Sequence, residues 1–336
     1  MADVAALAGV SITTVSHVLN GTRTVAPATV NRVRDAIDSL GYQLAKDQGS
    51  SLPSTRSIGF VAANSSYAYF AEVVQGVEAE SRERGFSLLL CASHDDPELE
   101  EQAVSTLLSR RVDGILLSPT ADWQRHTLPM LRKRPTPFVV VDRISEAGCD
   151  QVATENTSPA DALVSHLAEL GHQRIAILTG LPNLSTTSER LLGYQRALRR
   201  WQVPEAPELI VSGESSSKGG RFAVRELLKL SQPPTAIFSS NDAMTVGALQ
   251  ALADAGLKVP DDMALVAFDD FEWGDVFTPS ITVAAQPAYT IGAEAVKLLD
   301  LRMHDVRLGA HTVRLPADIV HRTSCGCDHS SFSAHR

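Results

Sequence analysis

The feature that most constrains this fold is a long alternation of short apolar runs with amphipathic helical segments after residue 57. A run such as Phe138–Val141 is apolar without interruption, which is typical of a strand buried on both faces of a parallel sheet. Helices must then cover both faces, so the pattern predicts an α/β fold. The predicted strands are 58–62, 87–91, 114–117, 138–141, 174–178, 208–211, 235–239, 263–268 and 281–283. The predicted helices are 70–84, 98–110, 160–170, 188–201, 219–230, 242–255 and 288–301.

The alternating region, residues 58–325, is too long for one compact core, which favours two similar α/β lobes. We expect lobe one to comprise residues 58–156 and 287–314. Lobe two should comprise residues 157–286 and 315–325, followed by a tail over 326–336.

Residues 1–45 show no strand signal and predict a small domain of three short helices. Their apolar residues recur at helical spacing: Val4, Leu7 and Ala8, then Val15, Val18 and Leu19, then Val30, Val33, Ile37 and Leu40. Gly9 separates the first two helices, and Ser11 suits the N-cap of the second. Residues 46–57 are polar and rich in Gly, Ser and Pro, which indicates a linker or hinge.

Composition excludes several classes of protein. Of the 336 residues, 44% are hydrophobic and 21% charged, which rules out a disordered chain and a collagen. No apolar run reaches the roughly 18 residues of a membrane span. The four cysteines are scattered and the N-terminus lacks a secretory signal, so we expect a cytoplasmic protein. The net charge of −9 argues against a nucleic-acid partner, but residues 1–57 alone carry +1 and the rest −10.

The second predicted helix carries a candidate DNA-binding surface. Small Ala5 and Ala8 allow the first two helices to cross closely, as in a helix-turn-helix. Short hydroxyl side chains on the second helix suit both phosphates and base edges. The candidate DNA-binding residues are Ser11, Ile12, Thr13, Thr14, Ser16, His17 and Asn20. The alternative is a small helical bundle that docks on the rest of the chain.

Polar and aromatic residues follow the predicted strands, where an open α/β sheet binds its ligands. The candidate ligand-binding residues are Tyr69, Phe70, Asp142, Arg143, Arg190, Asn241, Asp269 and Gln286. Two carboxylates, two guanidiniums and two amides make a near-neutral site rich in bidentate groups, which favours a neutral polyol such as a sugar over a phosphate. Taken singly, each residue has an ordinary alternative role as a helix cap or surface ion pair.

The sequence offers little support for catalysis or metal binding. His321, Cys325, Cys327 and His329 are metal-ligand types, but C-x-C is not a standard zinc spacing and a frayed tail is favoured. No nucleophile motif, phosphate loop or H-E-x-x-H segment occurs. We therefore expect neither an enzyme, nor a resident metal, nor a cofactor.

The segment from Asp3 to Asn20, D-V-A-A-L-A-G-V-S-I-T-T-V-S-H-V-L-N, resembles the headpiece of the lactose-repressor (LacI/GalR) family of bacterial transcription regulators. Further along, Val141–Arg143, Arg190–Tyr194, Ser240–Met244 and Phe268–Asp270 match the family's motifs in order. The resemblance covers nearly the whole chain.

This resemblance implies a helix-turn-helix headpiece joined to a two-lobed core like that of the periplasmic sugar-binding proteins. It implies a homodimer on a pseudo-palindromic double-stranded DNA operator, with no membrane association, and repression as the commoner mode of regulation. In ribose-type members a set of six residues holds the sugar, so a pentose-like effector is expected. The six are Asp142, Arg143, Arg190, Asn241, Asp269 and Gln286.

The chain departs from the family pattern in several places. His17 stands where the family usually has Arg, so the base contact should be weaker or differently specific. The hinge lacks the usual Arg, and Leu52 fits the minor-groove wedge only in a shifted register. Ser215 replaces a frequent aromatic residue, which leaves room for a ligand larger than ribose. Two alternatives stay open: a sugar receptor whose headpiece does not bind DNA, and a regulator with a nucleobase effector.

Overall fold

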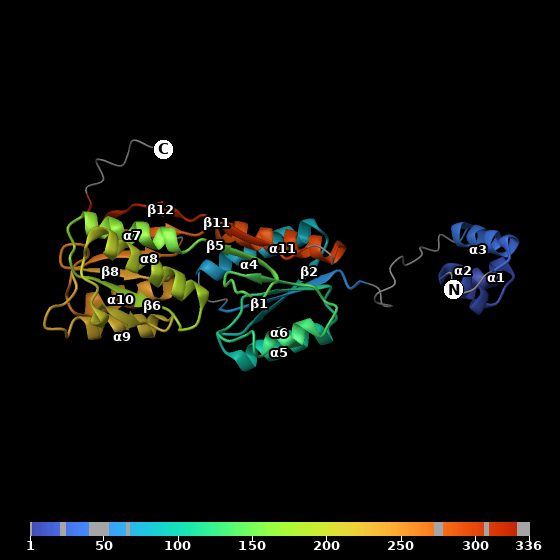
Figure 1. Cartoon of the computed structure of the whole chain (residues 1–336), viewed down its shortest axis with the longest axis horizontal. Helices are drawn as coiled ribbons and strands as arrows, with labels where there is room; N and C mark the ends of the chain where they lie inside the picture. The colour runs from blue at the N-terminus through green and yellow to red at the C-terminus, as the bar shows by residue number, and fades with distance from the viewer. Residues whose placement is uncertain are drawn as a thin grey trace, which may run out of the picture. The chain divides into compact units, whose positions relative to one another are not determined.

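The computed structural model describes residues 2–20, 25–39, 54–64, 68–271, 278–305 and 309–327. The chain divides into two compact units, Met1–Pro53 and Ser54–Arg336, and each is considered by itself. Figure 1 shows the N-terminal unit as helices alone and the second unit as helices and strands. Among the described residues, no helix is long and apolar enough to cross a membrane.

The first unit is built from α1 (Ala2–Ala8), α2 (Ile12–Asn20) and α3 (Pro27–Ser39). Its core is small and aliphatic: Val4, Ala5, Ala8, Val15, Val33 and Ala36. Gly9 has φ of +62°, the left-handed conformation that the turn between α1 and α2 needs. The predicted cap is confirmed, because the Ser11 hydroxyl accepts a 3.1 Å hydrogen bond from the Thr14 backbone N–H. Leu7 belongs to the apolar pattern of the sequence but not to the core, because 56% of its surface is exposed.

The first lobe of the second unit is a six-stranded sheet in the order β11-β5-β4-β3-β1-β2, with all its strand pairs parallel. Its strands are β1 (Ser57–Ala62), β2 (Ser87–Ala92), β3 (Gly114–Leu117), β4 (Phe138–Val141), β5 (Asp150–Thr154) and β11 (Thr312–Leu315). Helices α4 (Ala68–Glu83) and α11 (Ala288–His304) pack on one face. Helices α5 (Pro97–Ser109) and α6 (Thr127–Arg132) pack on the other (Figure 1).

The second lobe repeats this plan in the order β12-β10-β9-β8-β6-β7. Its strands are β6 (Ile175–Thr179), β7 (Ile210–Ser212), β8 (Ala236–Ser239), β9 (Ala264–Phe268), β10 (Thr282–Ala285) and β12 (Asp318–Val320). Helices α7 (Thr157–Glu169) and α8 (Ser185–Trp201) cover one face, and α9 (Ser217–Leu227) and α10 (Asp242–Asp254) cover the other. Only β12 runs antiparallel to its neighbour among these described strands.

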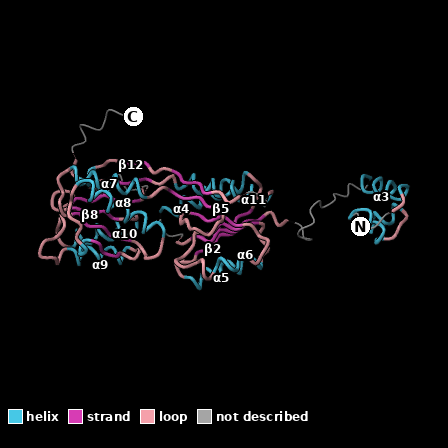
Figure 2. Tube along the Cα trace, viewed as in Figure 1, coloured by secondary structure: helices cyan, strands magenta, loops and turns pink. Residues whose placement is uncertain are grey.

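The chain passes from one lobe to the other three times, after β5, after β10 and after β11. Figure 2 shows these connections as short links between two groups of strands. Because the two strand orders are equivalent position by position, β4 of the first lobe corresponds to β9 of the second. The carboxyl ends of both sheets therefore meet at the junction of the lobes, which positions the candidate site.

The predicted alternation is confirmed, and four short elements were missed: β5, α6, β11 and β12. Strand β5 reads D-Q-V-A-T, with polar residues where a buried strand is expected to be apolar. It is nevertheless buried, because Asp150 forms a two-bonded ion pair with Arg302 of α11, at 2.6 and 2.8 Å. The predicted strand 208–211 begins later, at Ile210, after a 3-10 turn over Pro207–Leu209.

Candidate effector cleft and DNA-binding helix

Two aspartates occupy equivalent places at the ends of equivalent strands. Asp142 follows β4 with φ of +72°, and Asp269 follows β9 with φ of +76°. A non-glycine residue in this region costs about 1 kcal/mol or more, and such strain concentrates at functional sites. Asp142 is 6% exposed and Asp269 is 4% exposed. Each lobe thus presents one buried carboxylate, held by a strained backbone, to the space between the lobes.

In lobe one, Asp142 lies in a network of tethered groups. The Tyr69 hydroxyl of α4 donates a 2.9 Å hydrogen bond to Asp142 Oδ1. Arg143 forms an ion pair with Asp95, donates to the Pro119 carbonyl at 2.9 Å, and places its Nε 3.6 Å from Asp142 Oδ2. Burial raises the pKa of Asp142 despite Arg143, and burial together with Asp142 raises the pKa of Tyr69 well above its ordinary value. The Tyr69 phenol therefore stays a neutral donor.

In lobe two, the buried guanidinium of Arg190 on α8 contacts several residues of the cleft. This guanidinium lies 3.7 Å above the ring of Phe268 and donates to Asn156 Oδ1 at 2.9 Å and to the Ser240 carbonyl at 2.5 Å. Asp269 Oδ1 lies 3.9 Å from the guanidinium. These contacts fix the planar fork of Arg190, so that a ligand meets a pre-oriented donor.

Asp242 is the first residue of α10 and one of the residues that line the cleft. Its backbone N–H donates to Asp269 Oδ2 at 3.3 Å. The Tyr69 backbone, at the start of α4 in the other lobe, lies close enough to the Asp242 carboxyl group to lower its pKa. Burial and the neighbouring Asp269 carboxylate raise the pKa of Asp242 to about 6. The Asp242 carboxyl group therefore lies near both lobes, with a pKa above its ordinary value.

The cleft is more acidic than the sequence suggested. The near-neutral expectation counted two carboxylates, whereas Asp95 and Asp242 bring the number lining the cleft to four, against two guanidiniums. Such a site repels a phosphate or carboxylate ligand more strongly than a neutral site does. The expected preference for neutral hydroxyl-bearing molecules stays a prediction.

All eight residues predicted to bind a ligand line this one cleft. Two of them also have structural roles: Asn241 caps α10 through the Met244 N–H at 2.8 Å, and Gln286 donates to Asp269 Oδ1 at 2.5 Å. That they bind an effector stays a prediction. Sequence reasoning missed several other residues that line the cleft or hold its side chains: Asp95, Asn156, Thr186, Thr187 and Leu184.

The rule that ligand-binding residues follow the strands could have found one of these missed residues, Asp95, but not Asn156. Asp95 comes three residues after β2, so the strand-end rule alone could have selected it. Its neighbour Asp96 has a different role, because it caps α5 by accepting hydrogen bonds from the N–H groups of Glu98 and Leu99. Asn156 follows β5, a strand the sequence did not predict, so no signal pointed to it.

Two buried polar atoms of the cleft have no hydrogen-bond partner within the described residues: Arg143 Nε and Gln286 Oε1. One is a donor and the other an acceptor. Leaving a buried polar atom unsatisfied costs about 1–3 kcal/mol, so native proteins rarely do so without a reason. A hydroxyl group can both accept from a guanidinium and donate to an amide oxygen.

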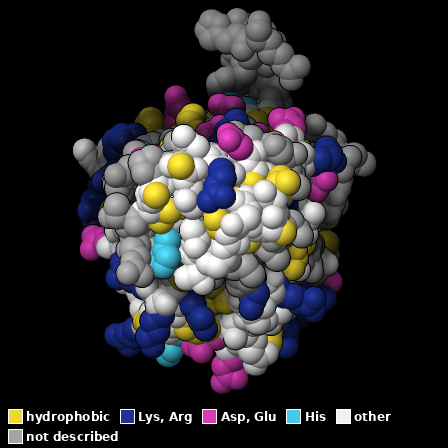
Figure 3. Space-filling view, turned by 90° about the vertical axis from the view of Figure 1, so that its right-hand side faces the viewer, with side chains coloured by type: hydrophobic (Ala, Val, Ile, Leu, Met, Phe, Trp, Pro, Cys, Tyr) yellow, Lys and Arg dark blue, Asp and Glu magenta, His cyan; other side chains and the backbone are white. Residues whose placement is uncertain are grey.

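In the N-terminal unit, α2 exposes part of the predicted DNA-binding set. Ser11 and Thr13 are exposed, and Thr14 and His17 are half-buried. The side chains of Ile12, Ser16 and Asn20, and all of Leu52, lie outside the described residues. On the face drawn in Figure 3, basic and acidic side chains are interspersed and apolar ones lie among polar neighbours.

Comparison with known protein families matches both parts of the chain. Residues 1–43 match the bacterial regulatory proteins of the lacI family, and residues 164–325 match a periplasmic binding protein-like domain. The ribose operon repressor of Escherichia coli (strain K12) is 36% identical over 328 residues, covering 96% of this chain and 99% of the repressor.

Two further relatives extend this picture. The transcriptional repressor PurR of Haemophilus influenzae (strain PittEE) is 34% identical over 299 residues, covering 88% of this chain and 89% of PurR. The solved structure of the transcriptional regulator CelR in complex with cellobiose is 31% identical, with a TM-score of 0.74, and covers 96% of this chain and 98% of that one. The chain therefore belongs to the LacI family of bacterial transcriptional regulators, with a DNA-binding helix-turn-helix and a periplasmic-binding-protein-like core.

Proposed function

We propose that this chain is a ligand-responsive repressor that binds a pseudo-palindromic operator as a homodimer and takes a small pentose-like sugar as effector. The observation that carries the effector class is the pair of unsatisfied buried atoms, Arg143 Nε and Gln286 Oε1, beside two buried aspartates. A sugar supplies adjacent hydroxyls, each of which donates to one such group and accepts from another. The relatives that act on a ribose operon or bind cellobiose support a sugar.

The cleft suggests how ligand binding reaches the headpiece. Asp142 and Arg143 belong to one lobe, and Arg190 and Asp269 to the other, so one ligand that contacts both sets favours the closed arrangement. A ligand shifts such an equilibrium by the difference in its affinity for the open and closed forms. The first lobe continues directly from the linker through β1, so a change in lobe orientation can alter the spacing of two headpieces in a dimer.

A ligand screen tests the effector. The purified full-length chain is heated with D-ribose, other pentoses, hexoses, cellobiose and a nucleobase panel. A pentose at about 100 times its Kd should stabilise the protein by about 2.7 kcal/mol. Asp269→Ala should abolish this shift, and Asp261→Ala, an exposed carboxylate elsewhere on lobe two, should leave it unchanged. A shift with a nucleobase and none with any sugar would refute the sugar assignment.

A gel shift tests the DNA-binding function. The chain should retard DNA from upstream of its own coding region, and the effector should change the affinity. We expect a shallow salt dependence, because residues 1–57 carry a net charge of only +1. If no retardation occurs at low salt, with or without the effector, the chain is instead a sugar receptor with a headpiece that does not bind DNA. If reporter expression does not rise when the chain is deleted, the protein is not a repressor.

A further inference from the structure

A cluster of metal-ligand side chains lies in lobe two, at the end of α7 away from the cleft. It joins one residue of α7 to three residues that follow β12 near the C-terminus. We call it the His/Cys cluster, and it comprises His166, His321, Cys325 and Cys327. His166 is nine residues beyond Thr157, which places it about 14 Å along α7 from the end that borders the cleft.

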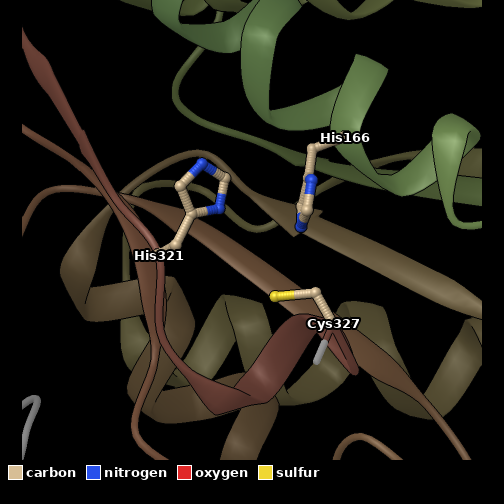
Figure 4. A group of neighbouring side chains, drawn as sticks. All are labelled: His166, His321 and Cys327. Atoms are coloured by element: carbon tan, nitrogen blue, oxygen red, sulfur yellow. The ribbon is translucent and has the colours of Figure 1, made fainter. Parts of the chain in front are cut away.

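The donor atoms of three members already converge. One ring nitrogen of each histidine and the sulfur of Cys327 all lie within 4.8 Å of one another. Figure 4 shows the two imidazoles side by side, and they pack edge to face with ring centroids 4.6 Å apart. The Cys327 side chain lies next to both rings. A tetrahedral zinc ion with bonds of about 2.0–2.3 Å sets its ligand atoms about 3.3–3.8 Å apart. Adjustments of about 1 Å would bring these three donors to that spacing.

Cys325 supplies a fourth donor next to the other three. Its sulfur lies 2.9 Å from the sulfur of Cys327 and accepts a 3.3 Å hydrogen bond from the Thr282 hydroxyl of β10. Only 1% of Cys325 is exposed. Two thiolates on one zinc ion lie about 3.8 Å apart, so a rotation of one thiol would open room for the metal. A hydrogen bond such as the one from the Thr282 hydroxyl holds the Cys325 sulfur in a fixed direction, as hydrogen bonds to metal ligands do.

The surroundings differ from the frayed tail expected at Cys327. Residues Thr323–Cys325 form a 3-10 turn, which Gly326 closes with φ of +81°. Cys327 is half-buried and packs against the lobe-two core beneath α7. The unusual C-x-C spacing is therefore compatible with a site, because the other two ligands come from separate elements.

We propose that the His/Cys cluster binds one zinc-class divalent cation, which ties the C-terminal end of the described chain to α7. Two thiolates balance the charge of a divalent ion and two neutral imidazoles add none, so the occupied site is neutral, as a mostly buried site requires. The ion stabilises the folded lobe because its ligands are brought together only by folding. It touches no residue of the cleft.

Metal analysis and cobalt substitution of the untagged full-length chain test this proposal. Protein purified from zinc-supplemented cells in reducing buffer should carry close to one zinc per chain. After chelation and titration with Co²⁺, the absorption spectrum should show tetrahedral coordination and a charge-transfer band of two-thiolate intensity. Less than a tenth of an equivalent of metal together with no tetrahedral spectrum would overturn the proposal. A Cys325–Cys327 disulfide that persists in the reducing buffer would also overturn it.

Variants then assign the ligands. Cys327→Ser and His166→Gln should weaken metal binding at least about 100-fold, since each removes a first-sphere bond. Cys325→Ser should halve the charge-transfer band, and Cys149→Ser, in lobe one, should change neither affinity nor spectrum. Full binding by Cys327→Ser would refute the site. If Cys325→Ser keeps the full charge-transfer band, Cys325 is not the fourth ligand. Loss of metal binding in His329→Gln would also refute Cys325 as the fourth ligand.

Discussion

Replacement of Asp242 by asparagine should stabilise the protein at neutral pH and not in acid. The folded chain raises the pKa of Asp242 to about 6, against 3.8 in the unfolded chain, because of burial and the adjacent Asp269 carboxylate. The folded state therefore binds the proton more tightly than the unfolded state. The stability that this proton provides is fully present below about pH 4 and is lost as the pH rises through about 6. A difference of about two pKa units corresponds to at most about 3 kcal/mol.

Asparagine keeps the shape of the side chain and an oxygen near the Tyr69 backbone, but it carries no charge to face Asp269. At pH 7.5 Asp242→Asn should therefore unfold about 5 °C above the wild type, given roughly 2 °C per kcal/mol for a domain of this size. At pH 3.5 the two should nearly coincide, because Asp242 is then mostly protonated in both the folded and the unfolded chain. Differential scanning calorimetry across this range measures both, with exposed Asp261→Asn as the control. Parallel pH profiles, or a lower melting temperature for Asp242→Asn at pH 7.5, would show that folding does not raise the pKa of Asp242.

Three further substitutions test packing, a buried hydrogen bond and a helix cap. Gly76→Ala should lower the free energy of unfolding by about 2–4 kcal/mol, because a Cβ there would lie 2.0 Å from a carbonyl oxygen of α11. The control Gly309→Ala places its Cβ in open space, and equal melting temperatures for the two variants would contradict this packing. Tyr194→Phe should cost about 1–2 kcal/mol in denaturant unfolding, since the buried hydroxyl donates to a strand carbonyl at 2.8 Å, and an unchanged midpoint would argue against that bond. Ser11→Ala should destabilise α2 by about 1 kcal/mol through the lost bond to the Thr14 N–H and weaken the gel shift, with effector binding unaltered; a loss of effector binding would be unexpected.

The parts of the fold that the sequence predicted are those governed by local pattern. Continuous apolar runs marked the inner strands, because a strand covered on both faces excludes polar side chains. The cleft residues followed from one geometric rule, since parallel strands all end at the same edge of a sheet. Asp142 and Asp269 were found in this way, although the left-handed backbone of both was not foreseen.

What the sequence did not predict depends on partners far apart in the chain. Strand β5 can be polar in sequence because Asp150 has a counterion, Arg302, on a helix 152 residues further along the chain. The contact between Asp242 and the start of α4 crosses the lobes. The His/Cys cluster joins α7 to the segment after β12, so no spacing rule within one segment could reveal it.

The paths by which the chain crosses between the lobes bear on how the protein is made. Strands β11 and β12, only a few residues apart, each form the edge of a different sheet. During synthesis both sheets therefore remain incomplete until residues 312–320 have emerged, and then both are completed together. Before that point each lobe carries an unpaired strand edge, which is a surface prone to aggregation. A chain that stops before Thr312 lacks the edge strands β11 and β12. Both lobes of such a chain are then incomplete, so neither lobe can fold fully before the other.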